Sequence, residues 1–192
     1  MFRITARALA FATALITLPA SATTPHGDDL PVCPSSGSQP TECLVSILNA
    51  GFDGEGSLVN WMPNLFNPHT VSIDDTANPK LVLAPGGSVS QVVPLSGGND
   101  DMERAPYFIP SLFARSEGGD AGIEVSVMLV GADGAYEAFS RAYTVGGVWS
   151  RPSGGFDASR GPATAMVIQI VRKDSNAGAT VYIDDVQVIR QR

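Results

Sequence analysis

Apolar and polar residues alternate along much of this 192-residue chain, in short runs rich in valine, isoleucine and threonine. Alternation with a period of two places successive side chains on opposite faces of a β-strand. Helical periodicity is close to absent. The pattern predicts eight strands, at residues 44–49, 80–83, 88–95, 107–115, 122–130, 136–144, 163–172 and 180–190.

Glycine, proline, asparagine and aspartate mark the turns between these strands, for example at residues 84–87, 96–100, 117–120 and 132–134. These residue types suit tight bends and positive φ. Many short strands punctuated in this way are typical of an all-β protein. We therefore predict two antiparallel sheets packed face to face, a β-sandwich of the jelly-roll kind. An immunoglobulin-like sandwich is the alternative, although the tryptophan and cysteine spacing of immunoglobulin domains is absent.

Two of the predicted strands show which of their faces turns inward. The strands at 122–130 and 163–172 each combine a purely apolar row with a mixed row. The mixed rows, which contain Glu124 and Gln169, suit the outer face of a sandwich or the floor of a shallow binding cleft.

The last strand carries two adjacent carboxylates, Asp184 and Asp185, inside an apolar and β-branched run. On a regular strand each aspartate shares its face with apolar residues: Asp184 with Tyr182, Val186 and Val188, and Asp185 with Val181, Ile183 and Ile189. An ionised carboxylate that loses water is costly unless it is paired. At least one of the two should therefore meet an arginine, a lysine or a metal ion.

The N-terminus has the pattern of a secretory signal peptide. Two arginines precede an apolar stretch at residues 8–18, and the small residues at 20–22 form a cleavage pattern. We expect residues 1–22 to be removed and the mature protein to be secreted or periplasmic. The apolar stretch is shorter than the roughly 20 residues that cross a bilayer, and no other segment is long enough, so no membrane partner is expected.

The remaining chain divides into a linker at residues 23–42, rich in proline, serine, glycine and aspartate, and one domain at 43–192. Without residues 1–22 the chain has 10 basic against 19 acidic residues, a net charge of −9. This acidity disfavours nucleic acid as a partner. The only cysteines, Cys33 and Cys43, are expected to form a disulfide that joins the linker to the first strand. The oligomeric state is left open.

Enzymatic interpretations find little support. His26 lies in the linker and His69 in a proline-rich loop, with no nucleophile-elbow motif nearby, which disfavours a serine hydrolase. Zinc would have too few histidine and cysteine ligands. Glycoside hydrolysis needs only two suitably spaced carboxylates, and it stays as a less favoured alternative with the candidates Glu103, Glu117, Glu124 and Glu137. We expect a non-catalytic protein.

The segment at 49–55 is the best candidate partner for the closing aspartates. Its glycines allow a sharp turn, and Asp53, Glu55 and main-chain carbonyls are the oxygen ligands that calcium prefers. Together with Asp184 they would form a calcium site. The alternative is a solvated acidic turn, with the strand aspartate paired to Arg172, Lys173 or Arg190.

Several short motifs follow one another in a recognisable order: Asn49-x-Gly51-Phe52-Asp53, Trp61, Ser90-Gln91-Val92-Val93, Phe113-Ala114-Arg115-Ser116, Trp149-Ser150 and Tyr182-Ile183-Asp184-Asp185-Val186. Over nearly the whole domain this order resembles the carbohydrate-binding modules of the jelly-roll group that bind cellulose and xylan, families 4, 9, 16 and 22. The resemblance implies a structural calcium shared by Asp53 and Asp184, with main-chain oxygens near Asn49 and Gly51. Asp53 stands where such modules more usually have glutamate.

Sugar binding requires aromatic faces against pyranose C–H surfaces and polar groups that reach the ring hydroxyls. The candidate residues are Gln91, Tyr107, Arg115, Glu124, Tyr136 and Gln169. The resemblance favours Gln91 and Arg115 among them. Trp61 and Trp149 are expected to serve packing, and Tyr136 and Tyr143 should point to opposite faces of their strand because an odd number of residues separates them.

These observations predict an exported, non-catalytic module that binds a soluble polysaccharide or oligosaccharide and carries one structural calcium ion. The competing interpretation is a structural or interaction protein of the same fold, at the cell surface or in the periplasm, without affinity for sugars.

Overall fold

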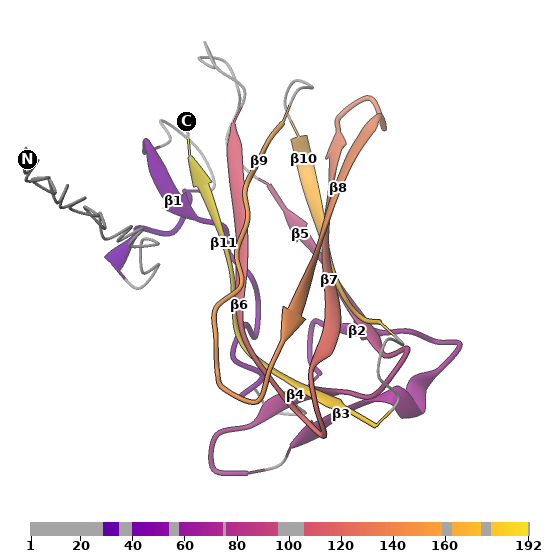
Figure 1. The fold of residues 1–192 in the computed structure, drawn as a ribbon. Helices are drawn as coiled ribbons and strands as arrows, with labels where there is room; N and C mark the ends of the chain where they lie inside the picture. The colour runs from indigo at the N-terminus through magenta and orange to yellow at the C-terminus, as the bar shows by residue number, and fades with distance from the viewer. Residues whose placement is uncertain are drawn as a thin grey trace, which may run out of the picture.

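The computed structural model describes residues 29–34, 40–53, 58–74, 76–95, 106–158, 163–173 and 178–191. The expected signal peptide, Glu55 and Glu103 lie outside them. The described residues form one short 3-10 helix, η2 (Pro68–Thr70), and eleven strands (Figure 1). The strands are β1 (Glu42–Leu44), β2 (Met62–Pro63), β3 (Val71–Asp74), β4 (Lys80–Leu83), β5 (Ser88–Pro94), β6 (Tyr107–Glu117), β7 (Ala121–Gly131), β8 (Tyr136–Val145), β9 (Phe156–Asp157), β10 (Ala163–Arg172) and β11 (Thr180–Gln191).

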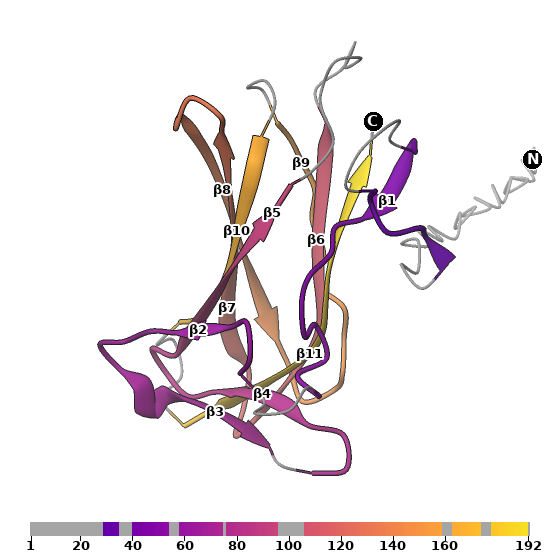
Figure 2. The ribbon, with the colours of Figure 1, turned by 180° about the vertical axis from the view of Figure 1, so that it is seen from behind.

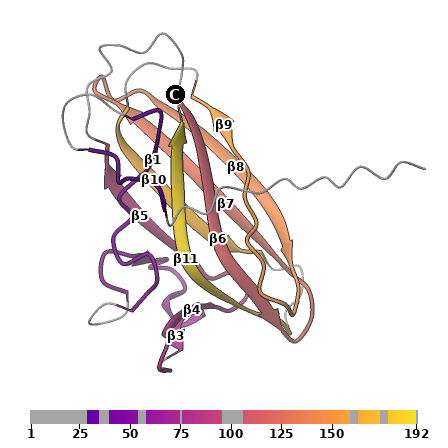
Figure 3. The same ribbon diagram turned by 90° about the vertical axis from the view of Figure 1, so that its left-hand side faces the viewer.

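The strands form two antiparallel sheets. The first sheet has the order β3-β4-β11-β6-β9, with β1 paired to β11 as well, and the second has the order β2-β5-β10-β7-β8. Figure 1 shows them as two layers, with β1, β11, β6 and β9 on one side and β5, β10, β7 and β8 on the other. In Figure 3 the first sheet lies in front of the second. The predicted all-β, two-sheet sandwich is thus confirmed.

Apolar rows from both sheets fill the space between the layers. The inward rows that the sequence predicted are buried on β7 and β10: Ile123, Val125, Val127, Leu129, Met166, Ile168 and Ile170. They meet buried residues of the first sheet, among them Leu81, Leu112, Val181, Ile183 and Val188. Removing this apolar surface from water is the main source of the fold's stability, at about 25 cal/mol per Å².

The predicted strand at 44–49 is wrong beyond its first residue, because the chain leaves the sheet after Leu44 and turns. Asn49 and Phe52 adopt left-handed φ values of 50° and 58°, which a strand cannot contain. The turn buries Phe52 against Trp61, with ring centroids 5.3 Å apart. Trp61 therefore serves packing, as expected.

The short strands β2, β3 and β9 were not predicted. β2 and β9 are only two residues long, which is too short for alternation to be distinguished from a loop, and β3 has four residues. β2 extends the second sheet beyond β5, and β3 extends the first sheet beyond β4 (Figure 2).

A β-bulge overturns the predicted alternation of the last strand. The register of β11 against β6 shifts between Asp184, which faces Phe113, and Gln187, which faces Ser111. Asp185 adopts a φ of 45° there. The extra residue places both aspartates on the outer side of the sheet while Ile183 and Val186 stay buried. Neither aspartate shares an apolar inner face, contrary to the expectation for a regular strand.

The predicted disulfide between Cys33 and Cys43 is confirmed. The Cys33 N–H donates to the Leu44 carbonyl (2.8 Å), and the Leu44 N–H donates to the Pro31 carbonyl (2.9 Å). Part of the predicted linker is therefore fastened to β1, which in turn pairs with the end of β11. No helix in the described part of the chain is long and apolar enough to span a membrane.

Replacing both cysteines, as Cys33→Ser with Cys43→Ser, should lower the free energy of unfolding by about 2–3 kcal/mol, because the bridge restricts a short loop in the unfolded chain. Urea unfolding of the oxidised parent and the double variant measures the difference. The reduced parent is the control and should match the variant. An unchanged unfolding midpoint would contradict the prediction.

Candidate functional site

The turn after β1 brings two carboxylates toward the same small space. A β-carbon placed on Gly51 would lie 3.6 Å from Asp184 Oδ1 and 3.8 Å from Asp53 Oδ1. The turn is fixed to the last strand because the Val186 N–H donates to the Ala50 carbonyl (3.1 Å). These are the two aspartates that the resemblance implied as calcium ligands.

Burial raises the pKa of Asp184 above its ordinary value, and the negative charges of Asp185 and Asp53 raise it further. A hydrogen bond from the Asp185 N–H to Asp184 Oδ1 (2.8 Å) and the charge of Lys80 oppose this rise in pKa. Ionising Asp184 is therefore unfavourable in the folded protein. A cation between the two carboxylates would relieve that cost.

Main-chain oxygens near the turn differ in their availability. The Asn49 carbonyl accepts hydrogen bonds from the Phe52 N–H (3.2 Å) and from the Trp61 indole N–H (3.0 Å), which occupy both of its lone pairs. Of the two implied main-chain positions, Asn49 thus has its carbonyl lone pairs already occupied. Among the described residues no group of three or more acidic, histidine or cysteine side chains gathers in one place. A calcium ion here would complete its shell with carbonyl oxygens or water.

Asp185, the second of the two adjacent aspartates in β11, is paired with a cationic side chain. Asp185 forms an ion pair with Arg151 and accepts a hydrogen bond from the Gln187 amide (3.1 Å). Arg151 also lies over the Phe113 ring, 4.3 Å from its centroid. The sequence therefore predicted correctly that one carboxylate meets a cation, but Arg151 was not among the arginines and lysine considered. Arg172 is buried and donates instead to the carbonyls of Gly122 (3.4 Å) and Ala179 (3.3 Å).

The structure places Gln91 in the interior. Its side chain is only 2% exposed, since residue 91 belongs to the inward row of β5. The Leu48 N–H donates to Gln91 Oε1 (2.9 Å), and Gln91 Nε2 donates to the Leu48 carbonyl (2.8 Å). Gln91 thus satisfies the backbone that leaves β1, and it faces no solvent-accessible surface.

Tyr107 and Arg115 belong to the outward row of β6, on the first sheet. Arg115 lies between two aromatic rings, 4.6 Å from the centroid of Tyr182 and 5.5 Å from that of Trp149. Glu117 joins Arg115 (2.8 Å) and accepts a hydrogen bond from the Tyr182 hydroxyl (3.0 Å), which raises the pKa of Tyr182. Arg115, Glu117 and Tyr182 are thus partnered with one another, although Arg115 Nε is buried and donates no hydrogen bond to the described residues.

The outer face of the second sheet combines three of the predicted residues. Glu124, Gln169 and Tyr136 belong to the outward rows of β7, β10 and β8. Glu124 is paired with Lys173 (2.8 Å), whereas Tyr136 is 64% exposed. Tyr143 turns inward and packs against the core, as its odd separation from Tyr136 predicted.

The register of the second sheet arranges its outward side chains into rows that cross four strands. One row offers an amide and hydroxyls: Ser90, Gln169, Ser126 and Ser140. The next row is apolar: Val92, Val167, Met128 and Ala138. At ordinary strand spacing each row is about 14 Å long, a span of several sugar rings.

Several exposed apolar residues on or beside this face were not predicted as site residues. Val92 and Met62, each 53% exposed, lie on β5 and β2, and Phe66, 93% exposed, lies in the turn after β2. Alternation on β5 could have identified Val92, since it follows the buried Gln91. No pattern in the sequence distinguishes Phe66 from an ordinary loop residue.

Two of the glutamates considered for hydrolysis, Glu117 and Glu124, do not converge. Glu117 lies on the outer side of the first sheet, paired with Arg115, and Glu124 lies on the outer side of the second, paired with Lys173. Carboxylates that cleave a glycosidic bond must flank it from a short distance. Glu117 and Glu124, on opposite faces of the sandwich, cannot form such a pair.

No family model matches the sequence, and no match to a curated protein was found. Solved structures do match. The CBM22-1 xylan-binding domain of Xyn10C from Paenibacillus barcinonensis aligns with a TM-score of 0.54 and 14% identity, over 81% of this chain and 99% of that one. TmCBM61, solved in complex with β-1,4-galactotriose, aligns with a TM-score of 0.50 and 16% identity, over 74% and 95% of the two chains. A CBM4 structure aligns with a TM-score of 0.50 and 17% identity, over 76% of this chain and 100% of that one.

The chain has the jelly-roll fold of carbohydrate-binding modules. The resemblance inferred from the sequence motifs is thereby confirmed at the level of the fold.

Replacing Asp184 by asparagine tests the electrostatic cost of its carboxylate. Because folding raises the pKa of Asp184, its stabilising contribution is present in acid and is lost as the pH rises through the folded-state pKa. In chelator, Asp184→Asn should therefore be more stable than the parent at pH 7, and the difference should shrink toward about pH 4. Urea unfolding of both proteins at several pH values measures the difference in their free energies of unfolding. A parent that is the more stable protein at pH 7 in chelator would contradict the assignment.

Proposed function

We propose that this protein is an exported, non-catalytic carbohydrate-binding module that binds a polysaccharide or oligosaccharide on the outer face of its second sheet. The observation that carries the proposal is the pair of neighbouring rows across β5, β10, β7 and β8. The amide and hydroxyls of one row can exchange hydrogen bonds with sugar hydroxyls, while the apolar row covers pyranose C–H surfaces. A basic N-terminus followed by an apolar stretch supports export.

The charges on this face suit a neutral glycan. Glu124 is balanced by Lys173 (2.8 Å), and the two rows between β5 and β8 carry no charged side chain. The shared fold with a xylan-binding domain and with a module that holds β-1,4-galactotriose supports the same class of partner.

The aromatic contribution comes from the margins of the face. Tyr136 pairs with Val130 at one side, and Phe66 follows β2 at the other. Both side chains are mostly exposed, which leaves ring surface for stacking on a sugar. The first sheet is the weaker candidate, because its aromatic rings already hold Arg115 and Lys80.

A structural calcium ion belongs to the same proposal. Asp53 and Asp184 would hold it, together with a main-chain oxygen at Gly51. The convergence of the two carboxylates on Gly51 and the raised pKa of Asp184 support this assignment. The ion would add a bond between β11 and the turn at 49–52, in a region where the chain has left the sheet.

Gln169→Ala should weaken glycan binding about threefold to tenfold, since it removes one or two hydrogen bonds at the centre of the polar row. Affinity electrophoresis in soluble xylan, β-glucan, mannan and β-1,4-galactan identifies the partner, and isothermal titration calorimetry gives the affinities. Gln191→Ala is the matched control: the same change at the end of β11 on the other sheet should leave the affinity unchanged.

Two results would contradict the site. Loss of binding in Arg115→Ala but not in Gln169→Ala would place the glycan on the first sheet. Absence of retardation by all four polysaccharides would favour an interaction protein of the same fold.

Calcium at a hundredfold excess over its Kd should raise the melting temperature by about 5–10 °C relative to the protein in chelator, because the ion binds only the native state. Asp184→Asn should abolish this increase. Asp157→Asn, which alters an exposed aspartate on β9, should retain it. If the parent has the same melting temperature in calcium and in chelator, the proposed calcium site is excluded, and the glycan proposal is unaffected.

A further inference from the structure

β8 and β9 are the edge strands of the two sheets, and they lie on the same side of the sandwich (Figure 3). A cavity of about 170 Å³ lies there between the layers. Val125 and Val127 of β7 line it from the second sheet, and Pro110 of β6 lines it from the first. The cavity is separate from the outward rows of the second sheet, because it lies on the inner side of β7 and β8.

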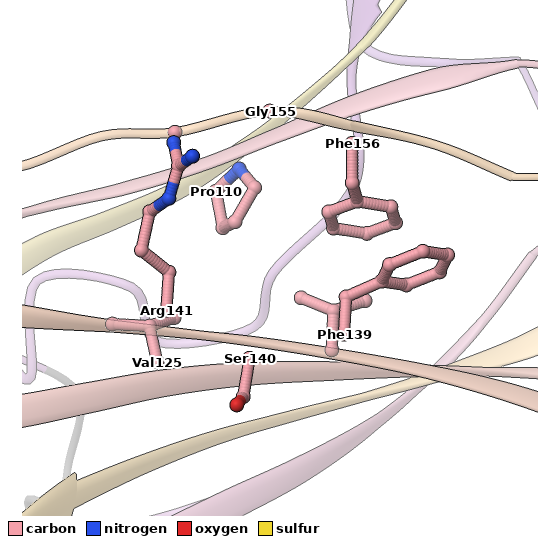
Figure 4. Close-up of a pocket in the computed structure, with 9 residues that line it drawn as sticks. Pro110, Val125, Phe139, Ser140, Arg141, Gly155 and Phe156 are labelled. Carbon is pink, nitrogen blue, oxygen red and sulfur yellow. The ribbon is translucent and has the colours of Figure 1, made fainter.

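Two aromatic rings form one end of the cavity. Phe139 of β8 and Phe156 of β9 stack with their centroids 3.8 Å apart, so the contact bridges the two sheets. Figure 4 shows this pair at one end, Arg141 at the other and Pro110 between them. The Ser140 hydroxyl points away from the cavity in the same view. Arg141 is therefore the main polar side chain of an otherwise apolar space.

Arg141 is an exposed side chain whose guanidinium group has no partner among the described residues. No hydrogen bond or ion pair joins it to any residue that the structure describes, whereas Arg115, Arg151 and Lys173 are each paired with an acid. The positive charge of Arg141 acts on the nearby Tyr143: burial raises the pKa of Tyr143, and the charge of Arg141 opposes that rise. A cation at the mouth of a cavity that pairs with none of the described carboxylates is available for a carboxylate from outside.

Two consecutive glycines make room for this arrangement. A β-carbon on Gly154 would overlap the Arg141 side chain, 2.7 Å from its Cδ and 2.9 Å from its Cζ. A β-carbon on Gly155 would overlap the Tyr107 ring. Neither glycine adopts a positive φ, so what they provide is space rather than unusual backbone conformation. The segment before β9 thus leaves the guanidinium beside the cavity.

The size and lining select a class of ligand. A cavity of about 150 Å³ with apolar walls is large enough to hold benzene. A sugar would lose hydrogen bonds with water here, since the valine, proline and phenylalanine walls cannot replace them. A carboxylate, in contrast, matches the fork of a guanidinium in a bidentate pair.

We propose that this cavity binds a small molecule with one aromatic ring that carries a carboxylate. The ring lies between the sheets against Val125, Val127 and the phenylalanine pair, and the carboxylate pairs with Arg141 at the mouth. This site is independent of the glycan face, and either can exist without the other.

Titration of the full protein with sodium benzoate tests the proposal, with isothermal titration calorimetry for affinity and NMR chemical shifts of the cavity residues for location. Benzamide, the neutral isostere, should bind at least about tenfold more weakly, because it lacks the charge. Acetate, which has the charge without the ring, should give no saturable binding.

Arg141→Gln should weaken benzoate binding about tenfold to a hundredfold and should make benzoate and benzamide equal. Gly154→Ala should also weaken benzoate binding, although Arg141 keeps its charge, because the added methyl group displaces the guanidinium. Gly147→Ala is the matched control: its nearest neighbour would be the Ser116 carbonyl at 3.9 Å, and binding should be unchanged. Melting temperatures near the parent's establish that the variants are folded.

The proposal is overturned if the parent shows no saturable binding at tens of millimolar benzoate, or if benzoate and benzamide bind it equally. It is also overturned if Arg141→Gln binds benzoate as tightly as the parent, or if the shifted NMR signals lie outside the cavity.

Discussion

The burial of facing apolar rows between the two sheets is the constraint on which the rest of this structure depends. β10 and β7 in one layer and β11 and β6 in the other present residues such as Ile168, Val127, Ile183 and Leu112 to a space without water. A slip of one residue in any of these strands would exchange its inner and outer side chains. The core therefore fixes the register, and the register decides which side chains reach the surface side by side.

The bulge in β11 interrupts the regular alternation of inward and outward side chains, and this keeps two adjacent carboxylates out of the core. A regular strand would have placed one of two adjacent carboxylates toward the core. One extra residue, with Asp185 in the left-handed region, turns both outward while Val186 returns to the interior. Asp185 then meets Arg151, and Asp184 meets the turn at Gly51. The two carboxylates thus have different surroundings: Asp185 has a protein cation, whereas Asp184 lies near the carboxylate of Asp53.

The second sheet contributes to two different surfaces. Its outward rows are polar and apolar strips that run across the strands, whereas its inner side forms the core except at the β8 edge. There the stacking of Phe139 on Phe156 bridges the two layers, and a space remains beside Arg141. The outward rows and the cavity therefore lie on opposite sides of the second sheet.

The sequence by itself determined the all-β class, seven of the eight predicted strands within a few residues, the inward rows of β7 and β10 and the disulfide. These follow from alternation and chain-local chemistry. Alternation also placed Glu124 and Gln169 on outward rows. It could not show that Gln91 would be used to satisfy the Leu48 backbone, because the chain's departure from β1 depends on the packing of Phe52 and Trp61.

Only the tertiary structure decided which predicted residues share a surface. Arg115 and Gln169 belong to similar strands, yet they lie on opposite faces of the sandwich because their strands belong to different sheets. The pairing of Asp185 with Arg151 and the meeting of Arg141 with Gly154 likewise join segments whose proximity arises from strand order. Periodicity reports on which side of its own strand a residue lies, whereas strand order, set by packing over the whole domain, determines its neighbours.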